Sequence, residues 1–167
     1  GLGYCRQGRL RGRICIPIHS PDGGRVVAFA GRWAGDRVPD GIPRYLMPRG
    51  FKKSAVLFNL HRVAPAGHLV IVEGYWSVFR LHGLKIPAVA LMGTSLSGVQ
   101  TDLLYQSGAR QLTLLLDGDE AGRNATATLL PRLASRFFVR APTLPDGGSP
   151  DDVPEKDLLD EIGRAHV

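Results

Sequence analysis

Cysteine is scarce in this chain of 167 residues, which contains only Cys5 and Cys15. Two cysteines cannot supply a zinc site by themselves, and no H-x-H or H-x-x-x-H spacing among the five histidines adds one. No stretch approaches the ~18 apolar residues of a membrane span. The sequence also shows no secretory signal, that is, no basic segment followed by an apolar one. We therefore expect a chain without a zinc site, working in the cytoplasm and without membrane contact.

Acidic residues are few in the first part of the chain. Residues 1–62 contain 12 Lys and Arg against 3 Asp and Glu, whereas residues 63–167 contain 9 against 12. The net charge of +6 is thus concentrated near the N-terminus. A basic segment joined to a mildly acidic one indicates a polyanionic partner for the basic part. A solvated basic surface with no specific partner is the alternative.

The first third of the sequence has the pattern of β-structure. Two apolar, β-branched segments, 13–18 and 25–30, flank the turn residues 21–24, which predicts a hairpin. Pro17 has no amide hydrogen to donate, and this favours an edge position for the first strand. Residues 33–50 are rich in Gly, Pro and Asp and predict an irregular segment, followed by a short helix over 54–63.

From residue 68 onward, short apolar strands alternate with helical patterns. The predicted strands are 68–72, 86–91, 111–116 and 136–141, and the predicted helices are 75–82, 98–106, 120–133 and 154–164. This alternation is typical of an α/β fold with a parallel sheet and helices on both faces. The length fits one domain of ordinary size with a small appended lobe.

Acidic residues follow two of these strands directly. Glu73 ends the strand 68–72, and Asp117 and Asp119 follow the strand 111–116. Carboxyl ends of parallel strands meet at one edge of a sheet, where ligands bind. Carboxylates at that edge can hold Mg²⁺ beside a phosphate or act as an acid or base. The alternative is that Asp117 and Asp119 only cap the next helix, and Asp151 likewise has the position of a loop or cap residue.

These acids and several other segments, in order, resemble a known family. A glutamate after one buried strand and an Asp-x-Asp after another resemble a TOPRIM domain, and the remaining matches resemble DnaG-type bacterial DNA primases. The matching segments are Gly12-Arg-Ile-Cys-Ile-Pro-Ile18, Val26-Val-Ala-Phe-Ala-Gly-Arg32, Arg44-Tyr-Leu46, Phe51-Lys-Lys53, Leu57-Phe-Asn-Leu60, Val70-Ile-Val-Glu-Gly-Tyr75, Ala90-Leu-Met-Gly-Thr-Ser95, Leu116-Asp-Gly-Asp-Glu-Ala-Gly-Arg123, Leu144-Pro-Asp-Gly147 and Pro150-Asp151. Together they extend over residues 12–153.

The resemblance implies an α/β TOPRIM fold: a mainly parallel sheet of about four strands flanked by helices, preceded by a small basic β subdomain. The implied domains are the basic β-rich subdomain over 1–66 and the TOPRIM domain over 67–167. It implies a fragment of a DNA primase, a nucleotidyltransferase that makes RNA primers for DNA replication. Carried over by position, Glu73, Asp117 and Asp119 are catalytic and, with Asp151, bind Mg²⁺ or Mn²⁺. The positions implied to contact nucleic acid or nucleotide are Arg13, Arg32, Arg44, Lys52 and Lys53.

The implied partners are single-stranded DNA template, nucleoside triphosphates and the RNA primer, and a replicative helicase through regions outside this chain. Two departures mark a divergent branch, of bacterial or mobile-element origin. Ser77 and Ser149 stand where the family has acids, and a hydroxyl is a poorer ligand for a hard cation. The alternatives are a TOPRIM-type nuclease that uses the same acids, and a nucleic-acid-binding module with a weakened active site.

Overall fold

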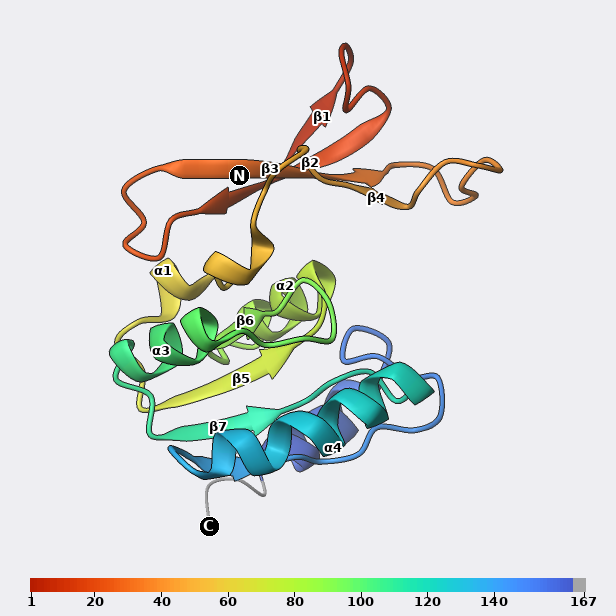
Figure 1. The fold of residues 1–167 in the computed structure, drawn as a ribbon. Coiled ribbons are helices and arrows are strands. Elements are labelled where there is room, and N and C mark those ends of the chain that lie inside the picture. The colour runs from red at the N-terminus through yellow and green to blue at the C-terminus, as the bar shows by residue number, and fades with distance from the viewer. Residues whose placement is uncertain (164–167) are drawn as a thin grey trace. The chain divides into compact units, whose positions relative to one another are not determined.

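The chain folds into two compact units that meet in sequence between Lys52 and Lys53. The structure, a computed structural model, describes residues 1–163. The first unit is a four-stranded sheet in the order β1-β2-β3-β4, in which each neighbouring pair is antiparallel. Its strands are β1 (Gly3–Cys5), β2 (Arg13–His19), β3 (Val26–Trp33) and β4 (Tyr45–Leu46). The predicted hairpin is confirmed as the pair β2 and β3 (Figure 1).

The edge position expected for β2 from its proline is wrong. Strand β2 lies between β1 and β3, so it is an inner strand. Strand β1, however, is short and pairs only with residues 13–15 of β2. Pro17 pairs with Phe29 of β3 and lies beyond the reach of β1. A proline is tolerated there because no neighbour on its open side requires an amide donor.

The second unit contains the parallel sheet that the sequence predicts. Its strand order is β6-β5-β7-β8, and every neighbouring pair is parallel. Helices flank this sheet on both faces (Figure 1). The elements are β5 (His68–Val72), α2 (Tyr75–Gly83), β6 (Ala88–Ala90), α3 (Gly98–Gln106), β7 (Gln111–Leu114), α4 (Glu120–Ala134), β8 (Phe138–Arg140) and α5 (Glu155–Gly163).

Both faces of strand β5 are buried, which explains its continuous apolar sequence. Leu69 and Ile71 belong to a core cluster that includes Leu104 of α3 and Leu133 of α4. The alternating residues at 70 and 72 are also fully buried. Strand β5 is therefore the centre of the second unit, and the segment after it is held at a defined place. No helix within residues 1–163 has the length and apolar character needed to cross a bilayer.

The segment before β5 differs from the helix predicted over 54–63. It forms a 3₁₀ turn, η1 (Lys53–Ala55), and the short helix α1 (Leu60–Val63). Between them, Phe58 makes a β-bridge to Ala90, and the side chain of Asn59 donates to the Ala88 carbonyl at 3.0 Å. This bridge takes the backbone groups that a continuous helix would use.

Residues of the same segment pack into the core of the second unit. Leu57 and Leu60 are buried members of the cluster around β5. The compact unit consequently begins at Lys53, whereas the sequence places the boundary after residue 66.

Candidate active site at the carboxyl edge of the parallel sheet

The structure brings the predicted strand-end acids together. Glu73 follows β5 directly, and Asp117 follows β7 after two buried leucines. Because β5 and β7 are adjacent and parallel, both segments reach the same edge of the sheet. The backbone amide of Asp117 donates to Oε1 of Glu73 at 3.2 Å. The two acids that the sequence places 44 residues apart are thus direct neighbours.

Two glycines allow the backbone to pass close to these acids. A Cβ atom added to Gly122 of α4 would lie 2.0 Å from the Asp117 carbonyl oxygen and 2.9 Å from Oε1 of Glu73. One added to Gly118 would lie 2.1 Å from the Pro145 carbonyl oxygen. Real Cβ atoms do not come this close to backbone oxygen, so only glycine fits at either position. Helix α4 therefore begins directly against the acidic residues.

The acids destabilise one another's charged forms. Burial, followed by repulsion from Glu73, Asp119, Asp151 and Asp152, raises the pKa of Asp117 to about 6. Burial, with a further contribution from Asp119, also raises the pKa of Glu73, although the hydrogen bond from the Asp117 amide opposes this. Each carboxylate that contributes must lie within electrostatic range. The loop that leads to Asp151 also contacts the turn between the two aspartates, since the Gly118 amide donates to the Gly148 carbonyl at 2.8 Å.

Asp119 serves as the N-cap of α4, which was the alternative role for this residue. Its Oδ1 accepts a hydrogen bond from the Gly122 amide at 2.7 Å. A carboxylate at a helix N-terminus is stabilised by the unpaired amides and by the helix dipole. The cap uses one carboxylate oxygen and leaves the charge of Asp119 near Asp117. Capping and cation binding are consequently compatible at this residue.

The donor set has the chemistry of a site for a hard divalent cation. Carboxylate oxygens are the protein ligands that Mg²⁺ and Mn²⁺ prefer, and a bound cation would relieve the repulsion that raises the pKa of Asp117. Within residues 1–163, no three His, Cys, Asp or Glu side chains already converge as a ligand group. Instead, one carboxylate oxygen of Glu73 and one of Asp119 each accept a hydrogen bond from a backbone amide. The residues suited to hold a cation are Glu73, Asp117, Asp119 and Asp151.

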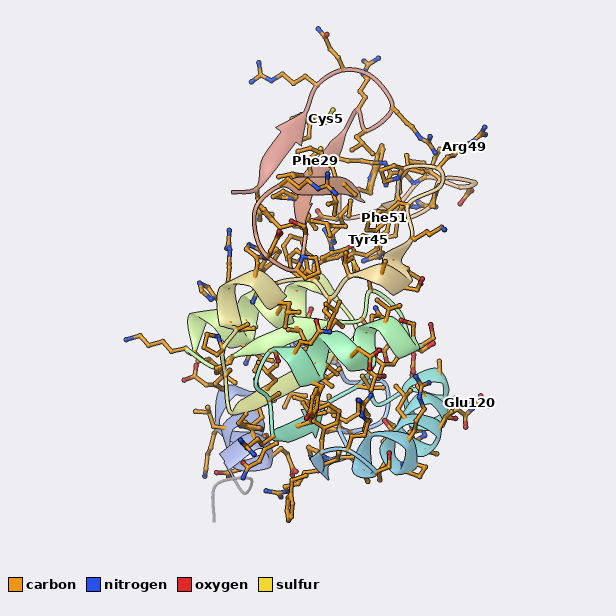
Figure 2. All side chains as sticks on the ribbon, turned by 60° about the vertical axis from the view of Figure 1, so that its left-hand side comes forward. Cys5, Phe29, Tyr45, Arg49, Phe51 and Glu120 are labelled. Atoms are coloured by element: carbon orange, nitrogen blue, oxygen red, sulfur yellow. The ribbon has the colours of Figure 1, made fainter. Side chains whose placement is uncertain are left out.

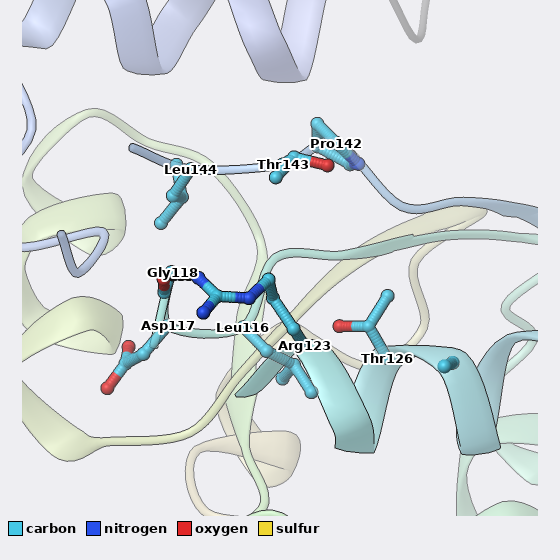
Figure 3. Close-up of a pocket in the computed structure, with 9 residues that line it drawn as sticks. Leu116, Asp117, Gly118, Arg123, Thr126, Pro142, Thr143 and Leu144 are labelled. Carbon is cyan, nitrogen blue, oxygen red and sulfur yellow. Dashed lines mark hydrogen bonds between the residues drawn. The ribbon is translucent and has the colours of Figure 1, made fainter. Parts of the chain in front are cut away.

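A cavity of about 200 Å³ lies beside Asp117, lined partly by Thr143 and Leu144. Figure 3 shows Arg123 of α4 extending across it toward Gly118. The guanidinium of Arg123 donates to the Gly118 carbonyl and, at 2.8 Å, to Oδ1 of Asp146. Arg123 thereby holds the turn between the two aspartates, a role that its place in the Leu116–Arg123 motif did not reveal.

Lys53 lies at the same unit's strand ends. Its Nζ donates to the Met92 carbonyl at 3.0 Å, in the loop that follows β6. The Met92 amide in turn donates to the Glu73 carbonyl at 2.9 Å. An exposed ammonium group is therefore anchored one residue from the backbone of the catalytic glutamate candidate. The contact of Lys53 with nucleic acid or nucleotide stays a prediction.

Arg13, which the resemblance implies as a nucleic-acid contact, has a different environment. It is buried, and its guanidinium donates to the carbonyls of Gly31, Arg44 and Pro43 at 3.1, 3.0 and 2.8 Å. It also lies over the ring of Trp33, with 5.7 Å to the ring centroid. These contacts hold the chain that enters β4. The burial of Arg13 does not favour a direct contact with phosphate.

The other predicted basic residues of the first unit remain accessible. Arg44 and Lys52 are exposed, and Arg32 is half-buried, with a hydrogen bond from its guanidinium to the Trp33 carbonyl. Sequence reasoning did not single out a second basic group, Arg6, Arg9 and Arg11, on the loop between β1 and β2. All three are exposed, and side chains of this loop, which follows Cys5, extend away from the strands (Figure 2). The excess of basic residues over 1–62 was the sequence feature that could have pointed to this group.

Comparison with known proteins bears directly on this arrangement. Residues 70–154, which contain the strand-end acids, match the family model described as Toprim-like. The chain belongs to the Toprim-like family. A DNA primase of Myxococcus xanthus is 36% identical over 164 residues, 93% of this chain and 26% of that protein. The chain spans only about a quarter to a third of its curated relatives, with 31% of a DNA primase of Aquifex aeolicus covered.

Solved structures agree with this family assignment. The zinc-binding and RNA polymerase domains of the Aquifex aeolicus primase superpose with a TM-score of 0.77 at 34% identity, over 95% of this chain and 40% of that one. A DnaG primase catalytic domain bound to single-stranded DNA gives a TM-score of 0.77 at 30% identity, over 98% of this chain and 54% of that one. TOPRIM domains of primases generally use divalent metal ions, and this agrees with the carboxylate cluster.

Proposed function

We propose that this Toprim-like chain is the catalytic segment of a DNA primase, which makes RNA primers on single-stranded DNA. The observation that carries the proposal is the contact between Glu73 and Asp117 at one sheet edge, in a chain of which 93% matches a DNA primase at 36% identity. In this proposal the basic β-rich unit, residues 1–52, binds nucleic acid, and the unit that begins at Lys53 carries the acids. The substrates are nucleoside triphosphates, consistent with a cytoplasmic location.

In the proposed reaction, the 3′-hydroxyl of the primer attacks the α-phosphorus of the incoming triphosphate, and pyrophosphate leaves. Asp117 and Asp119, supported by Asp151, hold Mg²⁺ or Mn²⁺, which supplies charge stabilisation at the phosphates when bound. Glu73 is either a further ligand or the acceptor of the hydroxyl proton, a role that its raised pKa suits. Protonation of Asp117 competes with cation binding below about pH 6.

We assign the nucleic-acid and nucleotide contacts to the accessible basic residues. Lys53 contacts a phosphate of the nucleotide, because its ammonium is anchored beside the backbone of Glu73. Arg32, Arg44 and Lys52 contact template or primer phosphates, and Arg13 supports them by fixing the carbonyl groups before β4. A replicative helicase would bind through regions outside this chain.

The decisive experiment is a calorimetric titration of Mn²⁺ into this chain, carried out with and without nucleoside triphosphate. Asp117→Asn is expected to lose binding while keeping its unfolding temperature, because it removes charge but little volume. The matched control is Asp102→Asn, because Asp102 is an exposed acid of α3 that forms an ion pair with Arg136; this variant should bind Mn²⁺ as the parent does. Equal binding by the parent and Asp117→Asn would show that the cation site lies elsewhere.

A nucleic-acid-binding module with a weakened site is the second candidate. The observation that favours it is that Asp151 receives hydrogen bonds from the neutral hydroxyls of Ser77 and Ser149. This candidate predicts single-strand binding with no Mn²⁺ binding in either condition. A nuclease would instead bind Mn²⁺ and release shortened products from single-stranded DNA, rather than extend a ribonucleotide primer.

A further inference from the structure

The carboxylate of Asp151 is held by two hydroxyl groups. Oγ of Ser77 donates to Oδ1 of Asp151 at 2.8 Å, and Oγ of Ser149 lies 3.0 Å from the same oxygen. Ser77 lies in the first turn of α2 and is only 2% exposed. Ser149 lies in the loop itself and also reaches Oδ2 of Asp152 at 2.9 Å. The stable donor to Asp151 is therefore the buried hydroxyl of α2.

The same face of α2 also holds the backbone on either side of that carboxylate. Arg80, three residues after Ser77, donates to the Asp151 carbonyl at 3.1 Å and to the Val153 carbonyl at 2.6 Å. Residues three apart on a helix share a face, so both side chains reach the loop from one side. Three hydrogen bonds from α2 thus define where Asp151 lies.

A neutral donor has a specific advantage at this position. The loop that leads to Asp151 lies against the turn between Asp117 and Asp119, since the Gly118 amide donates to the Gly148 carbonyl at 2.8 Å and the Gly147 amide donates to the Gly118 carbonyl at 3.2 Å. The negative charge of Asp151 therefore adds to the repulsion among the strand-end acids. An acid at position 77 would add to that repulsion and would need a cation to bridge it to Asp151. A lysine there would neutralise Asp151 and compete with a cation for it. A hydroxyl orients the carboxylate and leaves its charge available to a cation.

We propose that Ser77, together with Ser149, is a positioning residue that holds Asp151 so that its carboxylate contributes to divalent-cation binding by the strand-end acids. The inference rests on the proposed function, because it concerns the same cation site. It assigns to Ser77 a role through Asp151, without direct contact with the cation. Residues that orient metal ligands commonly change metal affinity by about 10–100-fold when removed.

The test compares Mn²⁺ affinity, measured by calorimetry, with unfolding temperature for four forms of the chain. Ser77→Ala is expected to weaken Mn²⁺ binding by about 10–100-fold. Ser77→Thr, which keeps the hydroxyl, is expected to restore most of that affinity. Ser107→Ala is the control for general loss of a buried hydroxyl, since the hydroxyl of Ser107, the residue after α3, donates to the Leu104 carbonyl of that helix. It should lower the unfolding temperature and leave Mn²⁺ affinity unchanged.

The outcomes separate this inference from the proposed function. Mn²⁺ affinity of Ser77→Ala within twofold of the parent, or an equal loss in Ser107→Ala, would overturn the positioning role alone. The proposed function would still stand if Asp117→Asn had lost binding. Absence of Mn²⁺ binding in the parent, with and without triphosphate, would overturn both. If Ser77→Thr is too crowded to fold, Ser149→Ala provides the second measurement, with a smaller loss of affinity expected.

Discussion

Asp117 carries the clearest electrostatic signature of any single residue in the chain. Its surroundings favour the protonated form, because burial removes water and four other carboxylates add negative charge. An acid whose pKa is raised by folding stabilises the native state only while it is protonated. Its contribution is complete below the unfolded pKa of 3.8 and is lost as the pH rises through about 6.

The metal-free chain should therefore be more stable at pH 5 than at pH 7. We expect the free energy of unfolding to be about 1 kcal/mol higher at pH 5, a value reduced for the partial exposure of Asp117. In Asp117→Asn the difference in stability between the two pH values should be smaller. A part of it should remain, because the pKa of Glu73 is also raised. Urea unfolding at the two pH values measures this. Stability that rises from pH 5 to pH 7 in the absence of metal would contradict the assignment.

Saturating Mn²⁺ should reverse this dependence. A cation bound to the charged carboxylates stabilises the native state only where those groups are deprotonated. The unfolding temperature with Mn²⁺ should therefore rise from pH 5 to pH 7, whereas it falls without metal. Thermal unfolding in Mn²⁺ and in a chelator provides the measurement, and Asp117→Asn should show no effect of Mn²⁺ at either pH.

Among the helices, α4 links the active site to the fold through its first turn. Asp119 caps the helix and carries one of the clustered charges, so the two contributions require separate substitutions. Asp119→Asn keeps a good cap and removes the charge; we expect stability within about 0.5 kcal/mol of the parent and weakened Mn²⁺ binding. Asp119→Ala should lose about 1 kcal/mol in addition. Unchanged Mn²⁺ binding in Asp119→Asn would show that Asp119 caps the helix and does not contribute to cation binding.

The close approach of α4 to the acids gives a second prediction for this helix. Gly122→Ala would place a Cβ 2.0 Å from the Asp117 carbonyl oxygen, so the helix must shift. We expect destabilisation of about 1–3 kcal/mol or more, together with loss of Mn²⁺ binding. Gly83→Ala is the matched control, because Gly83 ends α2 with no atom near the position of its Cβ. That substitution should stabilise by about 0.5–1 kcal/mol in urea unfolding.

Across the whole molecule, the basic residues are concentrated in residues 1–62, and in the proposed function this part binds single-stranded nucleic acid. The loop between β1 and β2 carries Arg6, Arg9 and Arg11, and the neighbouring Tyr4 is 61% exposed. Exposed basic groups beside an exposed aromatic ring suit a flexible strand, since phosphates bind the charges and a base can stack on the ring.

Replacing these three arginines with Gln should therefore weaken single-strand binding and its dependence on salt. Each lost phosphate contact lowers the slope of log affinity against log salt by about 0.7, so a reduction of about 2 is expected. A triple Gln variant of Arg62, Lys85 and Arg110 removes the same charge from the second unit and serves as the control. Equal slopes in the two variants, measured by fluorescence anisotropy, would show that net charge alone is responsible.

Much of the second unit follows from local sequence. Strand β5 is apolar on both faces and ends at an acid, and this pattern alone predicts a buried parallel strand with a functional carboxylate at its end. The cluster formed by Glu73 and Asp117 was predictable for the same reason, because adjacent parallel strands end at one edge. Helical patterns between the strands predict crossover connections, and these are compatible with few topologies other than a parallel sheet.

Long-range packing decided the remaining features. The pattern over 54–63 indicates a helix, but the bridge from Phe58 to Ala90 interrupts it, and a partner 32 residues away is invisible to local propensity. An arginine in a basic segment suggests phosphate, yet Arg13 is buried and bound to three carbonyls contributed by distant residues. The hydrogen bond from Ser77 to Asp151 joins residues 74 apart. Hydrophobic periodicity and the ends of strands depend on residues that are neighbours in the sequence. The hydrogen-bond partner of a polar side chain depends instead on which distant segments the folded chain brings together.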